Sequence, residues 1–250
     1  LAVFFAFAAI CASFGAANMF QTNQVANILN SSFGVPKLLT GIVISILTAV
    51  VSIGGIKRIG QVTSKLVPFM GGIYIVGALI VIIANIEKVP GLFGMIVHDA
   101  FNGTAAAGGF VGIAFIEVLK QGVRRACFSN EAGLGSAAIA HSAAATKEPV
   151  REGVVALLEP FIDTVVICTM TALVILISGA WTQDASGVEL TALAFNSAIP
   201  GFGSFFVPIA VAMFAYSTLL SWSYYGERAV DYLTGDKSAE KSILIYKLVF

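Results

Sequence analysis

Residues Arg124–Ala145 read RRACFSNEAGLGSAAIAHSAAA. The stretch places amide, carboxylate, hydroxyl and glycine residues in a chain that is 58% hydrophobic and 11% charged, with a mean hydropathy of +0.91. Soluble domains carry roughly 25% charged residues, and one soluble core could not bury this much apolar surface. Because lipid-exposed segments of such a chain must satisfy their own backbone groups, the composition indicates an all-α protein that crosses the lipid bilayer several times.

The net charge and the cysteines argue against several kinds of partner and site. The formal net charge is zero and no basic run is present, so we expect no nucleic acid partner. Cys11, Cys127 and Cys168 are isolated in apolar surroundings and have neither disulfide nor metal-ligand spacing. We expect no resident cofactor. Both ends of the chain lie inside apolar runs, so we expect residues 1–250 to be a single transmembrane domain that is incomplete at both ends.

The apolar stretches predict where the chain crosses the membrane. A crossing helix needs about 20 mostly apolar residues. Six spans and the start of a seventh are expected at Leu1–Ile28, Leu38–Gly54, Ser64–Ile86, Ala126–Ala145, Gly153–Gly179, Phe205–Gly226 and from Ser242. Turn residues mark two short loops, at Gly34–Pro36 and Pro90–Gly91, and a longer polar connection runs from Gly179 to Gly203.

Lysine and arginine residues predict the orientation through the positive-inside rule. They gather after the second, fourth and sixth spans, as Lys57, Arg58, Lys65, Lys147, Arg151, Arg228, Lys237 and Lys241. The alternate loops are poorer in cations, and the connection 181–204 carries Asp184 and Glu189 but no Lys or Arg. We therefore expect the cation-rich loops on the cytoplasmic side.

The same charges indicate that the quoted stretch is itself a crossing. Arg58 and Lys147 lie on the same predicted side, so an even number of crossings separates them, and Ser64–Ile86 is one. Gly108–Leu119 is only twelve residues long and runs into several charges, so we interpret it as an outer-face or re-entrant helix. Ala126–Ala145 has the length of one bilayer crossing and is expected to be the other.

Gly133 and Gly135 predict a break in the helix of this crossing. Each glycine disfavours a helix by about 1 kcal/mol relative to alanine, and unwound backbone survives in a bilayer only around a protein-lined or water-filled site. Secondary transporters bind small ions and zwitterions at such broken helices. The alternative is a small-residue packing face. That alternative suits residues 137–145 better than 128–135, because packing does not require Asn130 or Glu131.

A second polar set lies in the sixth predicted span. Ser217, Thr218 and Ser221 are spaced so that their hydroxyls could reach a small cation, and Trp222 shares the face of Thr218. Two structural explanations stay open at this stage. Serine and threonine hydroxyls commonly donate to their own i−4 carbonyl, and Trp222 could belong to an aromatic belt at the membrane interface.

Other polar residues are expected inside or beside the bilayer. Asn18, Gln21 and Gln24 share one helix face and could contact a carboxylate or an ammonium group, although an ordinary polar helix end explains them more simply. Asp163 lies deep in the fifth span, four residues after Glu159, and needs a partner there. A hydrogen-bond anchor for the broken helix is favoured over a role in proton uptake.

Three stretches in this order resemble one known family: NMFQTNQ (18–24), FSNEAGLGSA (128–137) with AIAHSAAA (138–145), and FAYSTLLSWSYYGE (214–227). They are similar to the alanine/glycine:cation symporters, also called sodium:alanine symporters, over nearly the whole chain. The resemblance implies a leucine-transporter-like fold of the amino acid–polyamine–cation superfamily, an inverted repeat of two five-helix units with discontinuous helices. The first three spans would be its third to fifth core helices, and the last three complete ones its sixth to eighth.

The resemblance also implies roles for particular residues. Those implied to bind substrate are Phe128, Ser129, Asn130, Gly133, Gly135, Trp222 and either Gln21 or Gln24. Ser217 and Thr218 would supply hydroxyls to the sodium site. The family's first core helix, with its unwound Gly-Thr-Gly-Asn segment, is absent from this sequence, so residues 1–250 alone are not expected to transport.

The function implied by the resemblance is sodium-coupled symport of a small neutral amino acid, alanine or glycine, by alternating access in the cell membrane. Proton coupling is the alternative, since Glu131 or Asp163 could take up a proton. An intramembrane hydrolase is disfavoured because Ser136 and His141 lie five residues apart and form no Gly-x-Ser-x-Gly motif. An ion channel is disfavoured because no charged ring or carbonyl filter repeats.

Overall fold

The computed structural model describes residues 1–102, 111–131, 133–185, 187–235 and 239–250, and within these ranges all regular structure is helical. The chain divides into two compact units. Unit 1 comprises residues 1–74, 186–192 and 201–250, and unit 2 comprises residues 75–185 and 193–200. The division falls within helices α4 and α11, so each unit holds one part of both.

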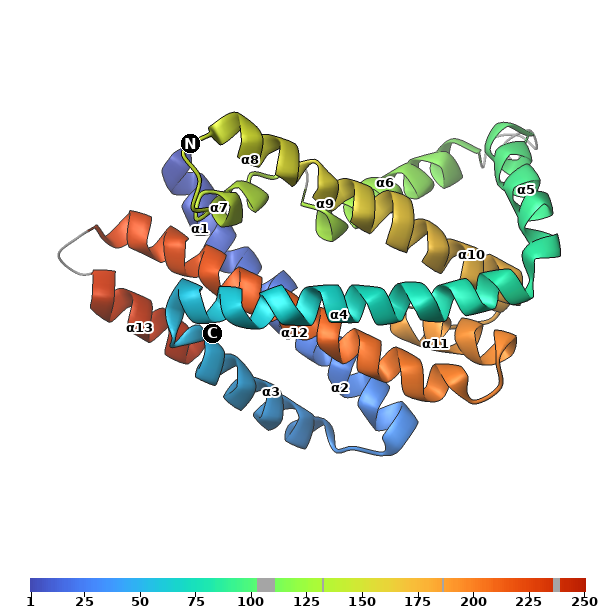
Figure 1. The fold of residues 1–250 in the computed structure, drawn as a ribbon, viewed down its shortest axis with the longest axis horizontal. Helices are drawn as coiled ribbons and strands as arrows, with labels where there is room; N and C mark the ends of the chain where they lie inside the picture. The colour runs from blue at the N-terminus through green and yellow to red at the C-terminus, as the bar shows by residue number, and fades with distance from the viewer. Residues whose placement is uncertain (103–110, 132, 186, 236–238) are drawn as a thin grey trace. The chain divides into compact units, whose positions relative to one another are not determined.

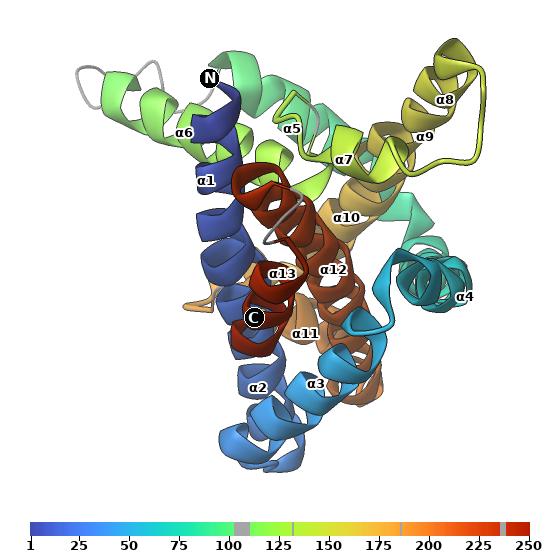
Figure 2. The ribbon, with the colours of Figure 1, turned by 90° about the vertical axis from the view of Figure 1, so that its left-hand side faces the viewer.

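Unit 1 is built on two long helical runs. Its helices are α1 (Ala2–Ala12), η1 (Ser13–Met19), α2 (Phe20–Phe33), α3 (Lys37–Ser52), the first part of α4 (Gly55–Ala84), the first part of α11 (Gly187–Ala198), α12 (Phe202–Thr234) and α13 (Ala239–Val249). α1, the π-helical η1 and α2 follow one another without interruption, and α12 packs against all three and against α3 and α13 (Figures 1 and 2). Ala6 and Ala9 of α1 are buried with Ala229 of α12, since small side chains let helix backbones approach closely.

Hydrogen bonds of hydroxyl groups join the helices of unit 1. Ser52 of α3 and Ser223 of α12 are hydrogen-bonded at 2.9 Å, and the Tyr216 hydroxyl donates to the Leu47 carbonyl of α3 at 2.9 Å. Tyr246 of α13 donates to Ser13 of η1 at 3.0 Å. Such bonds satisfy polar groups that neither lipid nor an apolar core would hydrate.

Unit 2 carries the helix break and a long rod. Its helices are the second part of α4, η2 (Ile86–Lys88), α5 (Val89–Asn102), α6 (Val111–Ser129), α7 (Ala137–His141), α8 (Pro149–Ala156), α9 (Leu158–Pro160), the π-helical η4 (Phe161–Cys168), α10 (Thr169–Ser178), η5 (Ala180–Thr182) and the second part of α11. α8, α9, η4 and α10 continue one another as a rod (Figure 1). α5 packs on α10, and α6 packs on η4.

Four helical runs of the described chain are long and apolar enough to cross a membrane: Ala2–Phe33, Gly55–Ala84, Pro149–Ser178 and Phe202–Thr234. Lys37–Ser52 is apolar but shorter. These runs confirm a helical membrane protein with several apolar segments. The expected total of six or seven crossings stays a prediction, because neither Ala126–Ala145 nor the segment from Ser242 forms such a run.

Several predicted boundaries are wrong because helix-forming polar residues extend the helices. The third span begins at Gly55 rather than Ser64, so Lys57, Arg58 and Lys65 lie on α4 and not in a loop. α12 continues past Gly226 to Thr234. Charged residues such as Lys, Arg and Glu have high helix propensity, so a loss of hydrophobicity does not end a helix.

Other errors concern the connections. Pro90 and Gly91, predicted to mark a loop, lie in the first turn of α5, where proline is tolerated. The polar connection 179–203 contains the helix α11. Gly108–Leu119 is not a separate short helix: from Val111 onward it belongs to α6, which runs to Ser129, and its first residues lie outside the described part.

Candidate functional site

The helix break predicted at the glycines is present in unit 2. α6 ends at Ser129 and α7 starts at Ala137. Between them the backbone takes left-handed values at Glu131 (φ 56°), Gly133 (φ 81°) and Gly135 (φ 85°). A non-glycine residue rarely adopts such a φ. Ala126–Ala145 is therefore not one continuous helix, and the unwinding expected at Gly133 and Gly135 is confirmed.

The rod holds the end of α6. The Ser129 hydroxyl donates a hydrogen bond to the Asp163 carboxylate, and Nδ2 of Asn130 donates to Thr164 Oγ1 at 2.7 Å. Asn130 is buried. Asp163 and Thr164 belong to η4, and π-helical segments frequently occur at functional sites. Ser129 and Asn130, which were expected beside the break, are thus held by adjacent side chains of one π-helical segment.

The far side of the break is also fixed. Ser136 donates to Glu131 Oε2 at 2.7 Å, which ties the start of α7 to the left-handed residue. His141 Nδ1 lies 2.7 Å from Glu152 Oε1, and its Nε2 lies 3.7 Å from Glu159 Oε2. Ser136 and His141 therefore have separate carboxylate partners, and no serine–histidine pair forms within the described part of the break.

Phe128 differs from its neighbours because its side chain is 56% exposed, whereas Asn130 is 9% exposed. Phe128 is the last aromatic residue of α6 before the break. Its position is compatible with the pocket-lining role implied by the resemblance, and that role stays a prediction.

The α12 hydroxyls bond to their own helix. Ser217 donates to the Phe214 carbonyl at 2.8 Å, Thr218 donates to the same oxygen at 3.0 Å, and Ser221 donates to the Ser217 carbonyl at 3.1 Å. The bonding back to the helix that the sequence left open is therefore present. It does not exclude a cation, because a hydroxyl that has donated its hydrogen keeps its lone pairs. The sodium site at Ser217 and Thr218 stays a prediction.

Trp222 is half-buried one turn beyond Thr218. Its ring meets the Tyr225 ring edge-on at 5.3 Å between centroids. Tyr246 Oη lies 3.5 Å from the Trp222 carbonyl. A Cβ at Gly226 would overlap the Tyr246 ring, so glycine at this position permits the close approach of α13.

Gln21 and Gln24, the two candidate substrate contacts of the first predicted span, lie on α2. Gln24 Oε1 lies 3.5 Å from the position that a Cβ would take at Gly187, the first residue of α11. Both side chains are half-buried, and neither amide has a hydrogen-bond partner among the residues that the structure describes. Asn18 bonds elsewhere, donating to the Phe250 carbonyl. The structure therefore does not separate Gln21 from Gln24, and the choice between them stays open.

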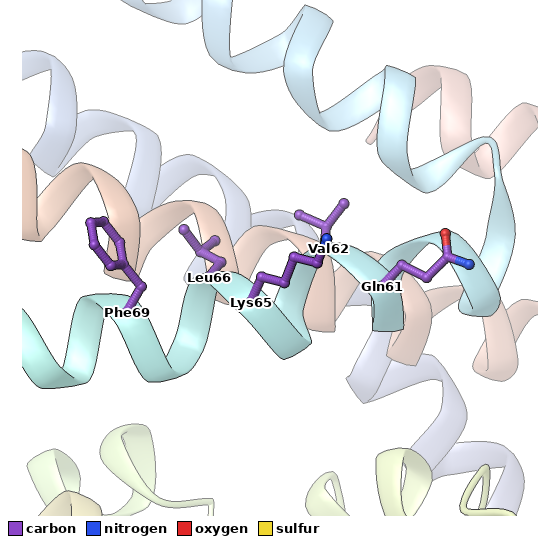
Figure 3. Close-up of a pocket in the computed structure, with 5 residues that line it drawn as sticks. All are labelled: Gln61, Val62, Lys65, Leu66 and Phe69. Atoms are coloured by element: carbon purple, nitrogen blue, oxygen red, sulfur yellow. The ribbon is translucent and has the colours of Figure 1, made fainter.

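A surface hollow lies on α4, and none of its lining residues is a predicted site residue. Its lining side chains all come from one face of that helix, as Figure 3 shows: Gln61, Val62, Lys65, Leu66 and Phe69. Ligand sites are usually concave and walled by several elements. An open hollow along a single helix is not a candidate substrate site.

The whole chain, residues 1–250, matches the sequence profile of the sodium:alanine symporter family. The chain belongs to this family. It is 45% identical to the sodium/alanine symporter AgcS of Methanococcus maripaludis, over all of this chain and 54% of that protein. It is 37% identical to the probable sodium/glutamine symporter GlnT of Bacillus subtilis, over 96% of this chain and 49% of that protein.

A third relative is the sodium/proton-dependent alanine carrier protein of Bacillus sp. strain PS3, 35% identical over 92% of this chain and 54% of that protein. The chain thus spans about half the length of the curated relatives it matches. Membership of this transporter family also means that the chain is part of a transporter and not of an enzyme.

The predicted site residues of this family member are divided between the two units. Gln21, Gln24, Ser217, Thr218 and Trp222 lie in unit 1, on the packed helices α2 and α12. The residues from Phe128 to Gly135 lie in unit 2 with their partners on η4. Thr164 was not predicted. The sequence signal that could have indicated Thr164 is its position directly after Asp163, a carboxylate expected at membrane depth.

Proposed function

We propose that the full-length protein is a secondary active transporter that moves a small neutral amino acid, alanine or glycine, together with Na⁺ across the cell membrane. Family membership and the apolar helices support a transporter in a membrane. The observation that carries the proposal is the polar break between α6 and α7. Unwound backbone at membrane depth is tolerated only where it is buried in protein or lines a water-filled cavity, and secondary transporters bind their substrates at such breaks.

In this proposal the amino acid binds at the break. Ser129 and Asn130 provide polar contacts, Gly133 and Gly135 keep the backbone open, and Phe128 covers the substrate. Following the family resemblance, either Gln21 or Gln24 also contacts the substrate. Trp222 forms a wall that restricts side-chain size. The AgcS relative, named for alanine, supports a small substrate. The GlnT relative is named for glutamine, which is larger than alanine, so the size of the pocket is the property to test.

Na⁺ binds to the hydroxyls of Ser217 and Thr218 together with main-chain carbonyls. Hydroxyl and carbonyl oxygens suit a hard alkali ion. Following the family resemblance, we propose a leucine-transporter-like inverted repeat in which a further unwound helix, outside residues 1–250, completes the sodium site. Joint binding of ion and amino acid would then favour an occluded state, and alternating access would follow from movement of the broken-helix bundle.

Uptake by the purified full-length protein in proteoliposomes tests the function. We expect saturable uptake of labelled alanine that is driven by an inward Na⁺ gradient and lost when K⁺ replaces Na⁺. Uptake that follows a proton gradient and ignores Na⁺ would instead establish proton coupling, to which the name of the Bacillus sp. PS3 relative draws attention. Unsaturable, ohmic current would contradict a transporter.

A matched pair of variants tests the sodium site. Thr218 and Thr234 both donate to a carbonyl four residues earlier on α12, at 3.0 and 2.9 Å. Thr218→Val should raise the KM for Na⁺ about tenfold, the loss of one ligand contact to a charged group, whereas Thr234→Val should leave it unchanged. Equal effects of both variants would mean that Thr218 acts only through its own helix.

A further inference from the structure

Asp163 is a carboxylate in the middle of a membrane-length helix. It lies at the midpoint of the 30-residue apolar run Pro149–Ser178. No lysine, arginine or histidine of the described residues forms an ion pair with it. An acidic group at membrane depth is costly unless it is paired, and such residues usually mark an ion or substrate pathway.

The neighbours of Asp163 satisfy only half of its carboxylate. Ser129 and Thr164 both donate to Oδ2, the latter at 3.3 Å. Oδ1 has no hydrogen-bond partner among the described residues, and the side chain is only partly buried. One carboxylate oxygen is therefore open to a ligand.

Further acceptor groups lie at the end of α6, which bonds to Asp163 through Ser129. The hydrogen of the Ser129 hydroxyl is used in the bond to Asp163, so its lone pairs remain. α6 also ends at Ser129, and the last carbonyls of a helix are unsatisfied and carry the negative end of its dipole. A single carboxylate with neutral oxygens suits a singly charged cation, whereas a divalent ion would demand more anionic ligands.

We propose that Asp163 and Ser129, with the carbonyl end of α6, form a binding subsite for a monovalent cation. The ammonium group of the amino acid and the coupling Na⁺ share this chemistry. The proposal rests on the transport function above and adds to it an anionic residue on η4. It differs from a purely structural anchor, in which Asp163 serves only as the acceptor for Ser129.

Asp163→Asn separates the two roles. An asparagine keeps an oxygen that accepts from Ser129 but removes the charge. In the full-length protein we expect Asp163→Asn to raise the KM for alanine or for Na⁺ by about tenfold or more, the loss expected for a charge-assisted contact. A rise confined to alanine identifies the ammonium group, and a rise confined to Na⁺ identifies the coupling ion. Asp163→Glu should recover part of the affinity.

The control is Asp184→Asn, which removes an exposed carboxylate that forms no hydrogen bond or ion pair with the described residues and should change neither KM. If wild-type protein transports alanine with Na⁺ but Asp163→Asn keeps both KM values, the cation subsite is wrong while the transport function stands. If wild-type protein fails to transport, the proposed function itself is wrong.

Cys168 provides a second measurement that needs no variant at Asp163. Its Sγ lies 3.6 Å from Ser129 Oγ, and its side chain is exposed. In protein whose other cysteines are replaced by serine, saturating alanine or Na⁺ should slow the reaction of Cys168 with a small maleimide several-fold. Labelling at the same rate with and without both solutes would contradict occupancy of the subsite.

Discussion

Glu131 is the one non-glycine residue of the described chain with a positive φ. Its carboxylate accepts from Ser136, so the strained backbone is held by a side-chain bond that spans the break. Strain of this kind costs about 1–3 kcal/mol and persists where the surroundings hold it. The role of Glu131 that follows from these contacts is to shape the break.

Trp222 provides a test of substrate size at the scale of one side chain. Replacement by alanine removes a half-buried ring next to the proposed sodium hydroxyls. We expect Trp222→Ala to admit larger neutral amino acids, with the ratio of kcat/KM for leucine over alanine rising about tenfold or more, because pocket methylenes are worth roughly 1–3 kcal/mol. Competition of leucine with labelled alanine measures the change. Unchanged selectivity would show that Trp222 does not limit the pocket.

At the scale of elements, the break and its brace act together. Ser129 and Asn130, at the end of α6, bond to η4, while His141, at the end of α7, pairs with Glu152 of α8. The rod formed by α8, α9, η4 and α10 therefore holds both helices that flank the break, α6 and α7. Polar contacts replace the continuous backbone bonds that the break has removed.

Gly133 tests whether the break needs its left-handed backbone. Alanine at φ 81° costs about 1–2 kcal/mol, although nothing lies within 4 Å to block its Cβ. We expect Gly133→Ala to lower the melting temperature and to reduce uptake. Gly153→Ala on α8 is the control, since that glycine has ordinary helical backbone and equally open space. A Gly133→Ala protein as stable as Gly153→Ala would mean that the break is not strained.

Gly226 tests the contact of α12 with α13. A Cβ at Gly226 would overlap the buried ring of Tyr246 and lie 2.9 Å from Ser13 Oγ. Because overpacking a core costs about 1–3 kcal/mol, Gly226→Ala should lower the thermal stability measured in detergent. Gly72→Ala on α4, where nothing lies within 4 Å, should leave stability unchanged or slightly higher. Equal melting temperatures would contradict this packing.

At the scale of the whole molecule, the distribution of cations predicts the orientation in the membrane. We expect a cysteine introduced as Lys57→Cys or Lys147→Cys, in protein without its native cysteines, to react with an impermeant maleimide only after the membrane is permeabilised. Asp184→Cys should react in intact cells. All three positions are exposed. Labelling of Lys147→Cys in intact cells would mean that an odd number of crossings separates Arg58 from Lys147. The charge pattern would then no longer indicate that Ala126–Ala145 crosses the membrane.

The sequence predicts best those features that depend on interactions between residues close together in the chain. The break at Gly133 and Gly135 was predictable because glycine acts locally on its own backbone. The ends of α4 and α12 were not, because hydrophobicity reports the lipid boundary and not the end of the helix. α11 was missed because a short helix with polar residues resembles a loop. Gln21 and Gln24 stay equal candidates, since their spacing puts both on one face and neither amide has a hydrogen-bond partner among the described residues.

The sequence by itself determined that this is a helical membrane protein, that its polar stretch is broken at two glycines, and that it belongs among sodium:alanine symporters. These properties depend on composition, on local backbone preference and on motif order. Only the tertiary structure decided which side chains meet. Ser129 reaches Asp163 across 34 positions and Tyr246 reaches Ser13 across 233. The pattern along a helix says which face is polar, but the partner on another helix depends on how the two helices pack.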